Sequence, residues 1–157
     1  MKSYFTSILW RCVFIASVLS AFLLTGCEED DRETSPILPG QVAILQVTIN
    51  PDPVYQGYEN KYRYTITVNE TNGVGATITS MKVERIDSGG TSFDSDNYDE
   101  GEVADTFGDS YIQPYGQLAT YVVHECYQCV YERWLLRYED DLGNKREMSA
   151  TVTMMPR

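Results

Sequence analysis

The residues best suited to chemistry lie in the segment His124-Glu-Cys126-Tyr-Gln-Cys129. Two thiols at this spacing can close a small disulfide across a turn. Together with His124 they could also supply three ligands to zinc, although no clear fourth ligand accompanies them. A redox role would need a helix after Cys129 to lower the pKa of the first thiol. The spacing alone therefore leaves a structural disulfide, a metal site and a redox pair open.

A second candidate is an acidic run within residues 91–116, a segment that we expect to be mostly loop and that is rich in acids and tyrosines. Calcium takes six to eight oxygen ligands, so carboxylates clustered on a loop could hold it. The spacing differs from an EF-hand loop, and a solvated acidic loop is the alternative. The candidate ligands are Asp94, Asp96, Asp99, Glu100 and Glu102. Calcium is thus a weak possibility, and no other cofactor is indicated.

Three tyrosines, Tyr98, Tyr111 and Tyr115, lie in or near the same segment. Exposed tyrosines provide large contact areas at a low entropic cost, which makes them candidates for a partner surface. Tyrosine is also often half buried, so packing against the core is the alternative.

The sequence contains no set of residues that indicates an enzyme. A single histidine leaves little material for a Ser-His-Asp relay, and no glycine-rich phosphate loop is present. The formal net charge of −11 disfavours a nucleic-acid partner, because phosphate binding requires a basic surface.

Alternation of apolar and polar residues shows which elements must position these side chains. From residue 42 onward the period is two, most clearly in Tyr62, Tyr64, Ile66 and Val68. Turn signals separate the alternating runs, and a change of phase between Ile78 and Met81 predicts a bulge. Residues 42–157 are therefore expected to be all-β, forming one immunoglobulin-like sandwich of about seven strands.

The segment 130–138 fits two periods, since its apolar residues match both a strand and a helical stripe. We favour a strand, because its neighbours are strands and the turn at residues 140–144 has the composition of a hairpin. The segment 137–144 with its following strand resembles the last hairpin of bacterial immunoglobulin-like repeats, which often contain Asp-x-x-Gly-Asn. That resemblance supports the same fold.

The N-terminus has the features of an export signal. Lys2 and Arg11 precede an apolar run from Cys12 to Leu24, which is shorter than the roughly 20 apolar residues of a membrane span. The sequence Leu24-Thr-Gly-Cys27 resembles the lipobox of bacterial lipoproteins. The resemblance implies that residues 1–26 are a signal peptide, that Cys27 carries lipid, and that residues 27–41 form an acidic linker. It also favours the outer membrane, on its periplasmic face or at the cell surface.

Export changes the interpretation of the two remaining cysteines, because an oxidising compartment favours a disulfide between Cys126 and Cys129. We therefore expect a non-catalytic envelope lipoprotein, held in the membrane by lipid on Cys27. Its immunoglobulin-like domain would act as an interaction or adhesion module for an envelope or surface protein. Two alternatives are a module that binds calcium or a small ligand through residues 91–116, and a small redox or metal protein that uses Cys126 and Cys129.

Overall fold

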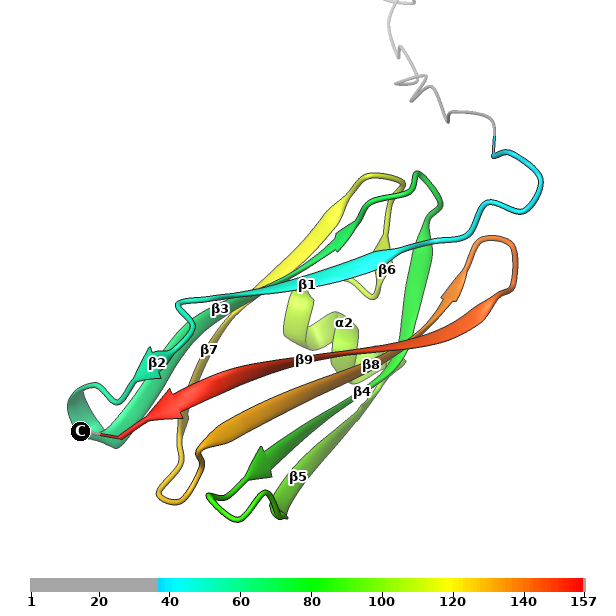
Figure 1. Ribbon diagram of the computed structural model, residues 1–157. Coiled ribbons are helices and arrows are strands. Elements are labelled where there is room, and N and C mark those ends of the chain that lie inside the picture. The colour runs from blue at the N-terminus through cyan, green and yellow to red at the C-terminus, as the bar shows by residue number, and fades with distance from the viewer. Residues whose placement is uncertain (1–36, 157) are drawn as a thin grey trace, which may run out of the picture. The chain divides into compact units, whose positions relative to one another are not determined.

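The computed structural model describes residues 37–156, which fold into two packed β-sheets (Figure 1). The expected signal peptide, the lipidation site Cys27 and the linker up to residue 36 lie outside the described residues. No helix within residues 37–156 has the length and apolar character needed to cross a membrane. The elements are β1 (Leu45–Asn50), β2 (Val54–Tyr55), η1 (Tyr58–Asn60), β3 (Lys61–Glu70), β4 (Ala76–Ile86), β5 (Ser92–Asp99), α2 (Glu100–Phe107), β6 (Tyr111–Ile112), β7 (Gln117–Glu125), β8 (Tyr131–Asp140) and β9 (Lys145–Met155).

The smaller sheet has the strand order β1-β3-β7, and both of its pairings are antiparallel. In β3 the predicted alternation is present, since Tyr62, Tyr64, Ile66 and Val68 are buried while the residues between them are half exposed. Successive side chains on a strand point to opposite faces, so this pattern gives the sheet one face toward the core and one toward solvent.

The larger sheet has the order β2-β9-β8-β4-β5, with β6 paired to the start of β4. The predicted bulge is confirmed, because the register between β4 and β8 shifts between Ile78 and Ser80. The extra residue allows Ile78 and Met81 both to face the core although they are an odd number of positions apart. Seven strands have six or more residues, which confirms the expected all-β sandwich with an immunoglobulin-like fold.

The core lies between the sheets and is built from the inward positions of both. Ile66 and Val68 of the smaller sheet belong to the same buried cluster as Leu136 and Val152 of the larger one. Burying an aliphatic side chain of this size contributes about 1.5–3 kcal/mol. The fold therefore follows from the two-residue period that the sequence displays.

The expectation that residues 91–116 are mostly loop is wrong, because they form β5, α2 and β6. The side chain of Asp99 accepts a hydrogen bond from the Glu102 N–H at 3.0 Å, and the Glu102 carboxylate accepts one from the Asp99 N–H at 2.9 Å. This capping box satisfies backbone donors at the start of α2. Gly108 ends the helix in the left-handed conformation, with φ of 85°. The acids that were interpreted as a solvated loop are thus partly a helix start.

The ambiguous segment 130–138 belongs to a strand, as predicted. It lies in β8, which pairs with β4 on one side and β9 on the other, so a helix is excluded. The predicted hairpin turn follows, with Gly143 at φ of 81°. The inward positions of β8 are Glu132, Trp134, Leu136, Tyr138 and Asp140.

The turns of the sandwich gather at two opposite ends (Figure 1). The described chain begins at the proximal end, defined by residues 37–44 with the turns 71–75, 113–116 and 140–144. The distal end is defined by residues 51–60 with the turns 87–91 and 126–130. Pairing of Leu45 with Glu70 at one end, and of Lys61 with Glu125 at the other, fixes this arrangement.

The proximal end is held together by the carboxylate of Glu70, which is only 3% exposed. Its two oxygens accept hydrogen bonds from the backbone N–H groups of Ile44, Asn72, Gly73 and Tyr115 at 2.7–3.1 Å. These donors belong to three separate segments, so one side chain joins the start of the sandwich to two of its turns.

Candidate functional site: a buried acid and imidazole beneath the disulfide turn

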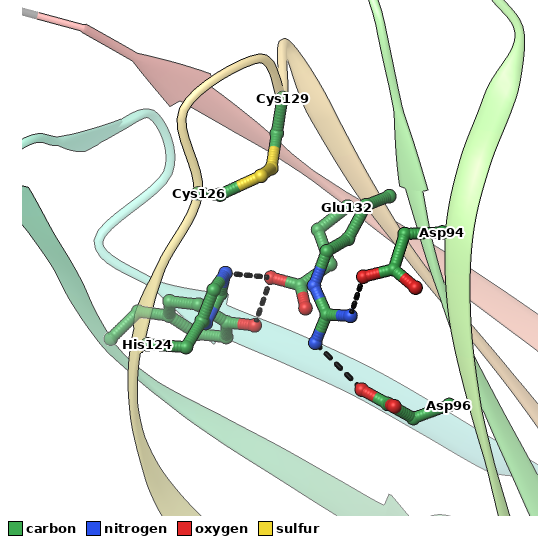
Figure 2. The surroundings of a disulfide bond; sticks show 8 residues. Asp94, Asp96, His124, Cys126, Cys129 and Glu132 are labelled. Carbon is green, nitrogen blue, oxygen red and sulfur yellow. Dashed lines mark hydrogen bonds and ion pairs between the residues drawn. A yellow bond between two sulfur atoms is a disulfide. The ribbon is translucent and has the colours of Figure 1, made fainter.

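Polar side chains enter the core close to the distal end. β8 contributes Glu132 and Trp134, β7 contributes His124, and β3 contributes Tyr64. Glu132 pairs with Arg85 of β4, and His124 pairs with Tyr62 of β3. These pairings place Glu132 and His124 near the ends of their strands. Figure 2 shows His124 and Glu132 pointing toward one another beneath the disulfide turn.

Glu132 is the centre of this cluster and is 1% exposed. The Tyr64 hydroxyl donates to Glu132 Oε2 at 2.7 Å, and Trp134 Nε1 donates to the Tyr64 oxygen at 3.1 Å. His124 Nε2 lies 3.3 Å from the same Glu132 oxygen. No backbone N–H group of the described residues donates to this carboxyl group, in contrast to Glu70.

Burial determines the charge of both groups. Desolvation raises the pKa of Glu132 to about 7, although the hydrogen bond from Tyr64 and the nearby Arg85 act in the opposite direction. Desolvation also lowers the pKa of His124 to about 4, with repulsion from Arg85 as the second cause. At neutral pH the imidazole is therefore uncharged, and the contact between Glu132 and His124 is not an ion pair.

A hydrogen bond between Glu132 and His124 would give a buried nitrogen a partner. His124 Nε2 is buried without a hydrogen-bond partner among the described residues, although Glu132 Oε2 lies 3.3 Å away. A protonated Glu132 can donate from Oε2 to this nitrogen while the same oxygen accepts from Tyr64. An unpaired buried polar atom costs roughly 1–3 kcal/mol, so such a hydrogen bond would stabilise the pair, and desolvation favours the protonated acid beside the neutral imidazole.

Arg85 acts electrostatically on both members of this pair and connects β4 to two acids of β5. Its guanidinium donates to Asp94 Oδ2 and Asp96 Oδ2, both at 2.7 Å (Figure 2). Two of the five predicted calcium ligands are thus bound to an arginine. Of the other three, Asp99 and Glu102 form the capping box and Glu100 is exposed at the helix start. Within residues 37–156, no group of three or more acidic, histidine or cysteine side chains is placed to hold a metal.

Cys126 and Cys129 form a disulfide in the turn between β7 and β8, and both are buried. A strand follows Cys129, so the helix that would lower the pKa of a redox-active thiol is not in place. His124 contacts Glu132 rather than the two sulfurs. The disulfide therefore closes the turn next to the polar cluster by a covalent bond.

The three tyrosines singled out in the sequence do not share one surface. Tyr98 packs against the core. Tyr111 lies at the proximal side, where its hydroxyl donates to Asp141 at 3.1 Å. Tyr115 is 66% exposed in the turn 113–116.

An open pocket of about 530 Å³ lies outside the cluster at the distal end. Its lining includes Arg85, Phe93, Cys126 and Tyr127, but neither His124 nor Glu132. The acid and the imidazole are therefore not part of the lining of this pocket.

Sequence reasoning missed Glu132 as a member of a site, although a signal was present. In the alternation of β8, Trp134, Leu136 and Tyr138 occupy inward positions, and residue 132 falls in the same phase. An acidic residue at an inward position predicts a buried carboxyl group that needs a partner. The partners Tyr64 and Arg85 come from distant strands, and no local pattern identifies them.

Comparisons with known proteins find only distant structural likenesses. No protein-family model matches it, and no curated protein matches it. Among solved structures, the ApaA protein of Bordetella pertussis is 12% identical, with a TM-score of 0.48, over 73% of this chain and 96% of that one. A CARDB domain from Pyrococcus furiosus, solved in complex with di-metal ions, is 18% identical, with a TM-score of 0.41, over 73% of this chain and 89% of that one. At such identities the function has to be argued from this chain's own residues.

Proposed function

We propose that this protein is a lipid-anchored, non-catalytic interaction module of a bacterial cell envelope. The immunoglobulin-like sandwich would be tethered through Cys27 and would present its distal end to a partner protein. The observation that carries the proposal is a difference between the two ends of the domain. The described chain begins at the proximal end, while exposed aromatic side chains gather at the distal end.

The distal aromatic surface consists of residues from different turns and strand ends, namely Tyr55, Tyr58, Phe93, Tyr127 and Tyr131. Tyr58 and Tyr127 are the most exposed of them, at 81% and 77%. Aromatic side chains dominate the energetics of protein interfaces because they bury large areas with few rotatable bonds. Five of them around one end of a sandwich favour a binding surface over chance exposure.

A non-catalytic role agrees with the burial and the neutral charge of His124 in the polar cluster. The single histidine of the chain is largely buried, with 16% of its side chain exposed, and desolvation keeps it neutral at physiological pH. A general base must reach the proton that it abstracts, and His124 Nε2 is buried beside Glu132.

The anchor is tested by labelling cells with an alkyne fatty acid. The unchanged protein is expected to carry the label and to fractionate with the outer membrane. A Cys27→Ala variant is expected to lose the label and to appear in the soluble fraction. Persistent labelling of the variant would contradict the anchor.

The interaction surface is tested by placing a photo-crosslinking amino acid at single positions in intact cells. Tyr127 and Tyr58 are the test positions, and Tyr115 is the control, because it is a tyrosine at the proximal end that is also well exposed, at 66%. Recovery of one defined envelope protein from the two distal positions but not from Tyr115 is the expected result. Equal yields of the same product from all three positions would contradict a distal binding surface.

A further inference from the structure

The two sides of the sandwich are closed unequally. On one side β1 lies against β9 and β2 lies against β3, so the two sheets approach one another there. On the other side β7 and β5 are the last strands of their sheets. Within the described part of the chain, β3 is the only strand to which the backbone of β7 pairs. The outer edge of β7 therefore leaves backbone N–H and C=O groups without a strand partner.

The two open edges differ in how they are protected. β5 carries Asp94, Asp96 and Asp99, and its pairing with β4 is irregular near its start. Charged side chains and irregularities of this kind prevent pairing with another chain. Residues 117–123 of β7 read Gln-Leu-Ala-Thr-Tyr-Val-Val, without a charge, a proline or a glycine. The stretch 117–123 of β7 thus lacks charges, proline and glycine, and the only charged side chain of the strand, Glu125, lies at its end.

Side-chain exposure along β7 shows that the sheet is incomplete at this edge. The inward residues Leu118 and Val122 are only half buried, whereas Ile66 and Val68 on the neighbouring β3 are 0% exposed. On the outward face, Tyr121 and Val123 are 63% and 45% exposed. A strand added to β7 would cover side chains on both faces as well as the free backbone groups.

The charge beside this edge indicates the chemistry of the added strand. Helix α2 packs against β7, β4 and β5 on the open side of the sandwich. Its acids Glu100, Glu102 and Asp105 are exposed, and no lysine or arginine of the described residues forms an ion pair with them. A second copy of this chain, with a net charge of −11, would be repelled, and so would the chain's own acidic residues 28–31.

We propose that the edge of β7 is a docking site for an extended segment of another protein that alternates basic and apolar residues. The segment would add as a fourth strand to the β1-β3-β7 sheet. Its apolar side chains would cover Leu118 and Val122, and its lysines or arginines would lie near the acids of α2. Strand addition of this type derives affinity from main-chain hydrogen bonds and specificity from alternate side chains. The proposal requires neither the lipid anchor nor the distal aromatic surface.

The test uses the full chain, solubilised in neutral detergent, and a synthetic nine-residue peptide that alternates lysine and valine. A second peptide has the same sequence but is N-methylated at alternate residues, which removes main-chain donors and keeps the charge. Binding is measured by fluorescence anisotropy, and the site is located by amide hydrogen exchange. We expect the unmethylated peptide to bind at least about tenfold more tightly and to slow exchange in residues 117–125.

Two variants with the same added charge complete the design. Tyr121→Lys places a cation on the proposed edge and should weaken binding of the lysine peptide by at least about tenfold. Gln46→Lys places one on the exposed face of β1, at the opposite edge of the same sheet, and should leave binding unchanged.

Several results would overturn the proposal. Absence of binding would do so, as would equal binding of the two peptides, equal weakening by the two variants, or protection confined to other strands. Protection of β7 without any peptide, together with a dimeric mass, would assign the edge to a second copy of this chain instead. Because the assay does not involve lipid labelling or crosslinking at Tyr127, its failure is distinguishable from failure of the proposed function.

Discussion

Replacing Glu132 with glutamine is expected to change how the stability of the fold depends on pH. Burial carries the pKa of this carboxyl from its ordinary value of 4.5 to about 7 in the folded protein. A raised pKa contributes stability that is fully present below pH 4.5 and is lost as the pH rises through 7. At about 1.4 kcal/mol per pKa unit, the loss amounts to roughly 3 kcal/mol.

His124 has the opposite dependence. Its pKa falls from 6.5 to about 4 on folding, so its contribution is present above pH 6.5 and is lost as the pH falls through 4. In the wild type the two slopes nearly cancel, because folding transfers one proton from His124 to Glu132. Single substitutions should expose each slope separately, because desolvation is the largest cause of each pKa shift.

The assay is urea unfolding of the wild type, Glu132→Gln and His124→Gln between about pH 4 and pH 8. From low to high pH, the stability of Glu132→Gln relative to the wild type should rise by roughly 3 kcal/mol, and that of His124→Gln should fall by a similar amount. The double variant should follow the wild type in slope. Parallel stability curves for the wild type and Glu132→Gln would refute the assignment of a raised pKa to this carboxyl group.

Three further changes test the supports around the core by denaturant unfolding. The two oxygens of Glu70 accept from four backbone N–H groups, and Glu70→Gln replaces one of these oxygens with a donor. The change should lower the free energy of unfolding by about 2–4 kcal/mol, whereas the exposed control Glu100→Gln should lower it by less than about 1 kcal/mol. Asp99→Ala removes the capping box of α2 and should cost about 1 kcal/mol, and a change no larger than that of the control would contradict the cap. Replacing Cys126 and Cys129 with alanine opens a four-residue loop and should cost about 2 kcal/mol; alkylation of both thiols in unreduced wild type would show that no bond was present.

The fold was predictable because its dominant signal is local. Alternation in β3 and in residues 148–154 fixes which side chains face the core, and the change of phase near Ile78 locates a bulge correctly. Residues 130–138 carry the same kind of signal, because the hairpin composition after the segment correctly predicts a strand in spite of a helical stripe. Periodicity and turn residues depend only on neighbouring positions, so they can be recognised in a single sequence.

Two features were not predictable in the same way, for different reasons. The start of α2 has a local signature, Asp99 followed three residues later by Glu102, but the density of acids around it favoured a loop or a calcium site. The pairing of Arg85 with Asp94 and Asp96 depends on the register between β4 and β5, which local composition does not give. The cluster around Glu132 needs four strands to be placed before any of its contacts exist.

Inward-facing acids show why burial alone does not decide charge in this fold. Asp140 is 4% exposed and Glu132 is 1% exposed, so desolvation acts to raise the pKa of both carboxyl groups. Asp140 nevertheless has a lowered pKa, because N–H groups of Asn144, Leu142 and Ala43 donate to it from a turn and from the incoming chain. Glu132 lies where strands already use their backbone donors on one another, and a tyrosine hydroxyl and a histidine are its neighbours. Asp140 thus remains charged as a structural anchor because backbone N–H groups donate to it, whereas Glu132, which no backbone N–H group of the described residues reaches, has a raised pKa. For this reason we place the pH dependence of the domain at its distal end, beneath the disulfide, and not at the end where the described chain begins.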